Sequence, residues 1–156
     1  MTKIGILHPG EMGVSVASSA INSGHEVYWV AYGRSEKTRQ RAEKYHLREV
    51  ESLTQFCQTC EIVISICPPY AAEDVARSVL EQGFKGYYLD ANAISPQQSV
   101  KIGEMMEADG IHFIDGGIIG GPAWKPKETW LNLSGRDAQV IADCFSNGLL
   151  ETKIIS

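Results

Sequence analysis

Near its amino terminus the chain reads Lys3-Ile4-Gly5-Ile6-Leu7-His8-Pro9-Gly10-Glu11-Met12-Gly13. Residues 3–7 predict a short apolar strand, and the His-Pro-Gly that follows predicts a turn. From residue 11 to residue 23 the apolar side chains recur at helical spacing, and Gly24 suits the left-handed position just past a helix. The stretch therefore predicts a strand, a glycine turn and a helix, the first half of a unit in which a helix connects two parallel strands.

The same alternation continues along the rest of the chain. Further strands are predicted over residues 26–32, 61–67, 86–89, 111–114, 129–134 and 151–155. Helices are predicted over residues 35–46, 52–60, 71–82, 95–109 and 137–145, with Ser35 and Asp137 as N-caps. Short apolar strands joined by helices predict a single α/β domain over residues 1–156 with a doubly wound, mostly parallel sheet. Ligands of such sheets bind at the carboxyl ends of the strands.

Composition narrows the classes of partner. The 156 residues are 44% hydrophobic and 21% charged, which is typical of a soluble globular domain. No apolar run approaches the roughly 20 residues that span a bilayer, and the early Lys3 argues against a secretory signal. The net charge of −5 comes without a block of Lys and Arg, so neither nucleic acid nor a membrane is expected as the partner. A small molecule in the cytoplasm is expected instead.

Four cysteines raise the question of a metal or redox site. Cys57 and Cys60 form a C-x-x-C pair, which is found in zinc and redox proteins. A zinc site needs a second pair of ligands at a suitable spacing, and none follows in the sequence. We interpret these two, together with Cys67 and Cys144, as reduced cysteines that serve as small core side chains. No metal site is assigned.

The first turn keeps two of the three glycines of a dinucleotide fingerprint, G-x-G-x-x-G. Gly10 and Gly13 are present, and His8 stands in the place of the first glycine. Gly10 allows the backbone to approach a pyrophosphate, Gly13 allows close packing of helix on strand, and the helix start offers free N–H donors. The alternative is an ordinary turn that contains two glycines. We interpret His8 as a turn residue near the cofactor rather than as a catalytic base.

The end of the second strand indicates which dinucleotide is bound. Proteins that select NAD usually place Asp or Glu there, about 20 residues after the glycines, to bind the ribose 2′-hydroxyl. Here the chain reads Ala31-Tyr32-Gly33-Arg34-Ser35, with no carboxylate before Glu36. Arg34 offers a guanidinium fork and Ser35 a hydroxyl for a 2′-phosphate. The alternative is a solvated arginine on a loop. NADP is preferred over NAD on this evidence.

Several motifs together resemble one family. They are Gly10-x-Met12-Gly13, Gly24-His25-x-Val27, Gly33-Arg34-Ser35, Cys67-Pro68-Pro69, the segment from Asp90 to Pro96, and Asp115-Gly116-Gly117-Ile118-Ile119-Gly120-Gly121. In this order they resemble the amino-terminal, Rossmann-type domain of the 6-phosphogluconate dehydrogenase and 3-hydroxyisobutyrate dehydrogenase superfamily. The resemblance covers the whole chain and is nearest to a poorly characterised subgroup with a helical carboxyl-terminal domain.

The resemblance implies a cofactor site and a substrate site. The implied cofactor-binding residues are His8, Pro9, Gly10, Glu11, Met12, Gly13, Gly33, Arg34, Ser35, Cys67, Pro68, Pro69 and Asn92. The implied substrate loop contains Gly117, Ile118, Ile119, Gly120 and Gly121, whose backbone N–H groups would bind a substrate carboxylate. The alternative for this loop is a glycine-rich turn after a strand. Asn92 and Ala93 replace the Ser and Thr of the family, and Asp90 and Asp115 are expected to brace their loops.

What the resemblance does not supply is a catalytic residue. In the family a helical domain follows and carries a lysine that moves the proton, and no such helix is present in these 156 residues. Two hypotheses therefore stand: the NADP-binding domain of an oxidoreductase acting on a small hydroxy acid, carbonyl or imine, and a non-catalytic module that binds or senses the dinucleotide. The surface that meets the helical domain should be apolar, so a homodimer is expected.

Overall fold

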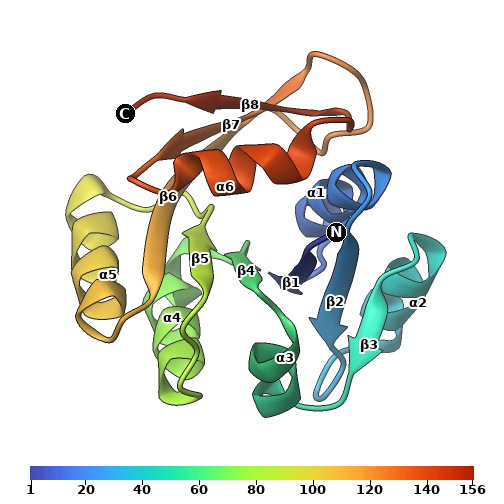
Figure 1. The fold of residues 1–156 in the computed structure, drawn as a ribbon. Coiled ribbons are helices and arrows are strands. Elements are labelled where there is room, and N and C mark those ends of the chain that lie inside the picture. The colour runs from blue at the N-terminus through green and yellow to red at the C-terminus, as the bar shows by residue number, and fades with distance from the viewer.

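The computed structural model describes all of residues 1–156 and confirms the α/β, doubly wound architecture (Figure 1). The strands are β1 (Lys3–Leu7), β2 (Glu26–Val30), β3 (Arg48–Val50), β4 (Ile62–Ser65), β5 (Tyr87–Asp90), β6 (His112–Ile119), β7 (Thr129–Ser134) and β8 (Leu150–Ile154). They form one sheet in the order β3-β2-β1-β4-β5-β6-β7-β8, and β6–β7 is the one antiparallel pair. The order turns back between β1 and β4, which is where such sheets bind ligands.

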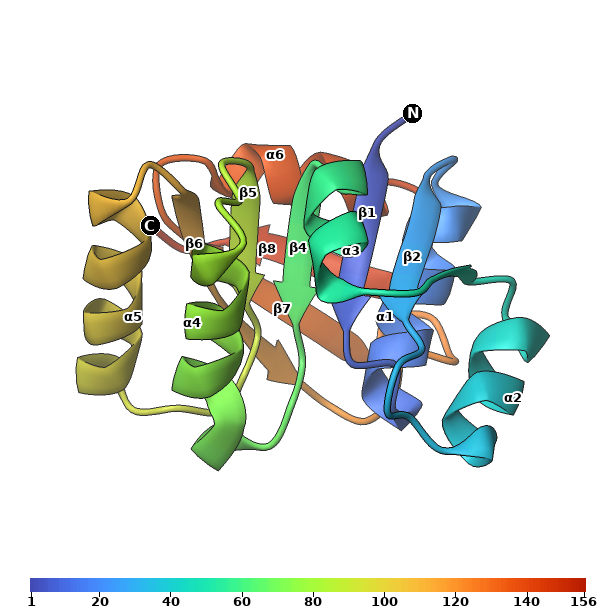
Figure 2. The ribbon, with the colours of Figure 1, turned by 90° about the horizontal axis from the view of Figure 1, so that it is seen from below.

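Helices cover both faces of this sheet. They are α1 (Glu11–Asn22), α2 (Glu36–Lys44), α3 (Leu53–Thr59), α4 (Ala72–Glu81), α5 (Pro96–Ala108) and α6 (Ala138–Ala142), with 3-10 turns at Pro69–Ala71 and Asp143–Phe145. Helices α1, α2 and α6 pack into one core cluster, and α3, α4 and α5 pack into the other on the opposite face (Figure 2). Every residue of β4 is buried because this strand lies between both helical layers. None of these helices combines the length and the apolar composition that a membrane-spanning helix requires.

Strand β6 is longer than the sequence indicates. It runs to Ile119, pairing in parallel with β5 as far as Asp115 and antiparallel with β7 from Asp115 to Ile119. The interpretation of the segment from Asp115 as a glycine-rich loop is therefore wrong up to Ile119. Glycine lowers strand propensity, and here that preference is overridden by pairing with the regular strand β7.

Two smaller differences have local causes. The three-residue strand β3 was not predicted, because Arg48–Val50 carries too short a pattern and forms only by pairing with β2 at the sheet edge. Asp137 stands at the start of α6, but its side chain makes no capping hydrogen bond. Its carboxylate lies 3.4 Å from the His112 ring instead.

A row of serines joins α1 to the last third of the chain. The hydroxyls of Ser15, Ser19 and Ser23 accept the backbone N–H groups of Ala123, Leu150 and Asn147 at 2.9, 3.0 and 2.9 Å. Their spacing of four residues places them along one face of the helix. This face fixes β8 and the loop before β7 against α1.

The C-x-x-C pair lies in the core. Cys57 and Cys60 are free and buried, packed in the cluster beneath α3. Burial raises the pKa of Cys57 to about 11 and that of Cys60 to about 12, so both thiols stay protonated at neutral pH.

Candidate functional site

The first turn brings backbone donors to the carboxyl end of β1. The α1 hydrogen bonds begin with Val14 N–H donating to the Gly10 carbonyl, so the N–H groups of Glu11 and Met12 have no acceptor within the helix. No heavy atom lies within 4 Å of the place a Gly10 Cβ would occupy, whereas a Cβ on Gly13 would collide with the His8 carbonyl oxygen. Gly10 thus leaves an open approach to the helix start, and Gly13 allows the helix to lie against the strand.

His8 and Arg34 form a pair across this site. The Arg34 guanidinium donates from Nη2 to His8 Nε2 over 2.7 Å; His8 comes from the turn after β1 and Arg34 from the turn after β2. Because arginine only donates, His8 accepts through Nε2 and holds its proton on Nδ1. Burial, with a smaller contribution from the charge of Arg34, lowers the pKa of His8 to about 4. The imidazole is therefore neutral near pH 7 and holds the guanidinium beside the turn.

The turn after β2 is also fixed locally. Gly33 has a φ of +75°, a left-handed conformation that favours glycine just before Arg34. The Ser35 hydroxyl accepts from the Thr38 N–H at 3.2 Å and caps α2, as predicted. Arg41 of α2 donates to the Pro9 carbonyl at 3.2 Å and so ties α2 to the first turn.

A buried polar network connects the loops after β4 and β5. The Asn92 amide accepts from Cys67 N–H at 2.7 Å and donates to the Ser65 hydroxyl at 3.0 Å, and Asn92 N–H donates to Asp90 at 2.9 Å. Asp90 braces its loop as predicted. Burial, assisted by the charge of Asp115, raises the pKa of Asp90 to about 6 although the Asn92 N–H opposes this. The network holds the two loops at a fixed separation.

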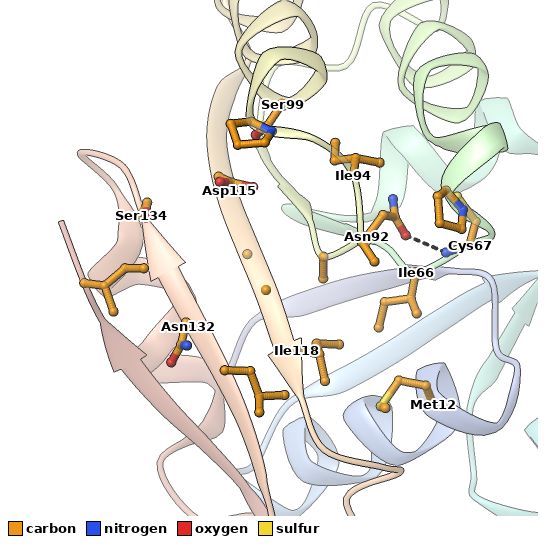
Figure 3. A pocket seen from close by; sticks show the side chains of 18 residues that line it. Met12, Ile66, Cys67, Asn92, Ile94, Ser99, Asp115, Ile118, Asn132 and Ser134 are labelled. Atoms are coloured by element: carbon orange, nitrogen blue, oxygen red, sulfur yellow. Dashed lines mark hydrogen bonds between the residues drawn. The ribbon is translucent and has the colours of Figure 1, made fainter.

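These loops and β6 enclose a cavity of about 600 Å³ (Figure 3). Among its lining residues are Met12 from the first turn, Cys67 and Pro69 after β4, Asn92 after β5, and Gly117, Ile118 and Ile119 of β6. Figure 3 shows Met12 and Cys67 on one side of the cavity and Asp115, Ser134 and Asn132 on the other. The cavity therefore lies between the first turn on one side and strands β6 and β7 on the other.

Most predicted site residues come together, whereas Gly120 and Gly121 lie apart from the others. One group lies after the carboxyl ends of β1 and β2 and contains residues 8–13 and 33–35. The cavity-lining residues described above form the neighbouring group. Gly120 and Gly121 lie outside the cavity lining, and the Gly121 carbonyl accepts from Thr129 at 2.6 Å. Which of these residues touch a cofactor or substrate stays a prediction.

Sequence reasoning missed two contributors. Arg41 reaches the first turn from the second turn of α2, and a basic residue six places after the N-cap Ser35 gives no recognised signal. The side chain of Asp115 was expected to accept backbone hydrogen bonds, but it makes no hydrogen bond and faces the cavity. Alternation along the extended strand β6 would have placed it there, had the strand been predicted at full length.

A doubly wound parallel sheet with a glycine turn and an open helix start at its first crossover defines a dinucleotide-binding domain. The chain belongs to the family described as the NAD binding domain of 6-phosphogluconate dehydrogenase, whose model matches residues 3–144. The resemblance found in the sequence is thereby confirmed.

Individual relatives agree with this family. An uncharacterised 28.5 kDa protein of Methanothermus fervidus is 33% identical over 118 residues, 76% of this chain and 45% of that protein. A conserved protein of unknown function, described as structurally similar to 3-hydroxyacid dehydrogenases, is 28% identical with a TM-score of 0.82, covering 97% of this chain and 57% of the other. An imine reductase from Myxococcus stipitatus, solved with NAD+, shares the fold at 17% identity and a TM-score of 0.78, over 97% and 54%. The chain spans about half the length of these relatives.

Proposed function

We propose that this chain is the NADP-binding domain of an oxidoreductase that transfers hydride between nicotinamide and a small hydroxy acid, carbonyl or imine. The observation that carries the proposal is the Arg34 guanidinium, held by His8 beside the first turn where a ribose 2′-phosphate would lie. The end of β2 offers no carboxylate, and Glu36 lies 3.9 Å from Arg39 in the first turns of α2. A cation without a neighbouring carboxylate favours the phosphorylated dinucleotide.

The residues present fit a dinucleotide at this edge of the sheet. The free N–H groups at the start of α1 would bind the pyrophosphate, and Gly10 leaves the backbone accessible. Arg34 would bind the 2′-phosphate, and Arg41 keeps the first turn in place through Pro9. When bound, the nicotinamide supplies or accepts the hydride. The loop containing Cys67 and the side chain of Asn92 would border its ring and keep water away.

The size of the cavity and the names of the relatives support the proposed range of substrates. The cavity of about 600 Å³ is large enough for a small organic molecule beside a nicotinamide. One relative is described as similar to 3-hydroxyacid dehydrogenases and another is an imine reductase, which supports hydride chemistry at a carbon bound to oxygen or nitrogen.

A titration tests the cofactor proposal directly. The purified chain is titrated with NADPH and with NADH, following the fluorescence of the reduced nicotinamide. We expect NADPH to bind about tenfold more tightly, because only NADPH engages the guanidinium. Equal affinities would overturn the NADP preference, and no binding of either would overturn the proposed function.

Oxidation of NADPH distinguishes an enzyme domain from a module that only binds the dinucleotide. We expect the 156-residue chain to bind NADPH but to turn over little, because general acid–base catalysis contributes typically 10²–10⁴-fold and no proton-transfer residue is assigned in this chain. Turnover in the usual range of about 1–10³ s⁻¹ with a carbonyl or imine would contradict this expectation and direct attention to His8.

The open face of β6, β7 and β8 supports self-association. Ile119 and Trp130 are paired neighbours on this face, and Ile155 follows at the end of β8, with exposed fractions of 60%, 39% and 56%. We propose that a second copy of the chain covers these side chains, since exposed apolar groups clustered on one face tend to be buried by association.

Four free cysteines further support the expected cytoplasmic location.

A further inference from the structure

We propose that His8 is a second, proton-dependent ligand of the 2′-phosphate of NADP. When the phosphate binds, His8 takes up a proton from solvent, releases the Arg34 guanidinium and donates to a phosphate oxygen. The inference rests on the proposed function, because it assigns a specific role to one side chain of the same cofactor site.

The imidazole of His8 is held in place before a ligand arrives. The backbone N–H of His8 donates to the Ile66 carbonyl at 3.1 Å, and the Gly10 N–H donates to the His8 carbonyl at 2.8 Å. From this fixed turn the half-buried His8 ring meets the exposed Arg34 at 2.7 Å. The first glycine of a dinucleotide fingerprint has no side chain at this place. His8 therefore adds an ionisable group to a turn that otherwise offers backbone donors.

The ring lies within reach of a phosphate that Arg34 binds. An oxygen that accepts from Arg34 Nη2 at about 2.8 Å lies no more than about 5.5 Å from His8 Nε2, because the two nitrogens are 2.7 Å apart. A phosphate monoester has three free oxygens, so one can accept from Arg34 while another faces the ring. The phosphate thus meets both side chains at once.

A neutral His8 cannot serve this phosphate. Its proton is on Nδ1, so Nε2 carries a lone pair that would face the lone pairs of a phosphate oxygen. Once Nε2 takes up a proton, it no longer accepts from Arg34 and becomes a donor itself. Both side chains then make charge-assisted hydrogen bonds to the phosphate. NAD has no 2′-phosphate and gives His8 no reason to take up this proton.

The electrostatics favour the proton only when the anion is present. Without a ligand, burial and, less strongly, the charge of Arg34 hold the pKa of His8 at about 4. An opposite charge within about 4–6 Å typically shifts a pKa by about 1–3. We therefore expect the bound 2′-phosphate to raise the pKa of His8 to about 5–7.

No group of the chain takes the place of this anion. Arg34 is the one charged residue that shifts the pKa of His8. On the adjoining elements, Arg41 of α2 is bound to a backbone carbonyl, Glu11 opens α1 as an exposed residue, and burial raises the pKa of the Cys67 thiol after β4, so it stays uncharged at neutral pH. No carboxylate forms an ion pair or hydrogen bond with His8 or Arg34.

Proton NMR of the imidazole rings tests the proposal on the unaltered chain. The His8 resonance is identified by its absence in His8→Gln and is followed between about pH 3.5 and pH 8 without ligand, with NAD+ and with NADP+. We expect the pKa of His8 to rise by at least about 1 with NADP+ and to stay near its free value with NAD+. An unchanged pKa with NADP+ overturns the proposal. Equal rises with both dinucleotides show a response to the pyrophosphate and overturn the assignment to the 2′-phosphate.

Calorimetric affinities provide the second measurement. A pKa of about 6 in the complex against about 4 in the free chain makes NADP+ bind roughly tenfold more tightly at pH 5 than at pH 8. The 2′-phosphate itself titrates near pH 6, so the profile is compared with that of His8→Gln, in which only the phosphate titrates. We expect the affinity ratio of unaltered chain to variant to rise about tenfold for NADP+ and to stay constant for NAD+. Parallel profiles for NADP+ overturn the proposal.

A control variant and the NAD+ titration separate the two levels of the argument. His46→Asn removes an exposed imidazole just after α2 and should leave both pH profiles unchanged. If NADP+ binds more tightly than NAD+ and the pKa of His8 does not rise, the role of His8 is wrong and the proposed function stands. If neither dinucleotide binds, the proposed function is wrong.

Discussion

Replacing Arg34 by alanine removes the one cation at the end of β2 that adjoins the first turn. In the unaltered chain the guanidinium is held by His8 at 2.7 Å and is therefore positioned before any ligand arrives. Alanine leaves a neutral His8 and the Ser35 hydroxyl, so the charged donor for a 2′-phosphate is lost. NADPH should lose affinity while NADH, which has no such phosphate, should bind as before.

The size of the loss follows from the type of contact and its exposure. A hydrogen bond to a charged group contributes about 1.5–3 kcal/mol, which is roughly ten- to a hundredfold in affinity. Arg34 is exposed at the surface, so water and salt screen the interaction and the low end of that range applies. We therefore expect about a tenfold loss for NADPH at low ionic strength, diminishing as salt is added.

The assay is a fluorescence titration of both reduced dinucleotides at two salt concentrations. Arg48→Ala is the matched control, because Arg48 is also exposed but lies at the amino end of β3, whereas Arg34 follows the carboxyl end of the neighbouring parallel strand β2. Unchanged NADPH affinity in a folded Arg34→Ala chain would refute the reasoning. Equal losses for NADPH and NADH would show that Arg34 supports the turn instead of contacting the phosphate.

Four other outcomes follow from the same structure. Gly10→Val should abolish binding of both dinucleotides and leave the circular dichroism spectrum unchanged, since its Cβ meets nothing within the fold; retained affinity would place the site elsewhere. Ser19→Ala leaves the Leu150 N–H without its acceptor and should lower the free energy of unfolding by about 1–3 kcal/mol, which lowers Tm by several degrees. Ser18→Ala is the control: it loses no hydrogen bond and should leave Tm unchanged. Trp130→Glu should convert a dimer into a monomer in light scattering coupled to gel filtration, and a monomeric parent chain would contradict the proposed interface. The pKa of His8 is lowered to about 4 in the folded chain, whereas the unfolded chain takes up this proton near pH 6.5. Between these two pH values the unfolded state binds more protons than the folded state. The contribution of His8 to stability is therefore fully present above pH 6.5 and is lost as the pH falls toward 4. His8→Gln should flatten this part of the stability profile in urea titrations, and an unchanged slope would contradict the shift.

The sequence predicted the fold well because its signals were local and repeated. The glycine turn, the Ser35 cap and the left-handed Gly24 each require only neighbouring residues, and all three are present in the structure. The strand Thr129–Ser134 matched residue for residue, since clean alternation of apolar and polar side chains specifies a half-buried strand.

What the sequence did not predict depends on partners distant in the chain. The extension of β6 through its glycines exists because β7 pairs with it, and the edge strand β3 exists because β2 does. The His8–Arg34 contact joins two turns 26 residues apart, and neither turn alone indicates it. Sequence patterns predicted candidate residues of the site. Tertiary contacts determined which of their polar groups are already hydrogen-bonded within the chain.

The serine row on α1 sets an order of events during translation. Helix α1 leaves the ribosome early, yet the N–H groups that bind Ser15, Ser19 and Ser23 belong to residues 123–150, which are synthesised more than 100 residues later. Until then these hydroxyls bind water, and the α1 face of the sheet is only partly covered. Parallel pairing of β1, β2 and β4 can begin earlier, because those strands are made in the first half of the chain. We expect the nascent chain to remain exposed to chaperones and proteases on this face until residue 150 has emerged, since contacts of long sequence separation form late.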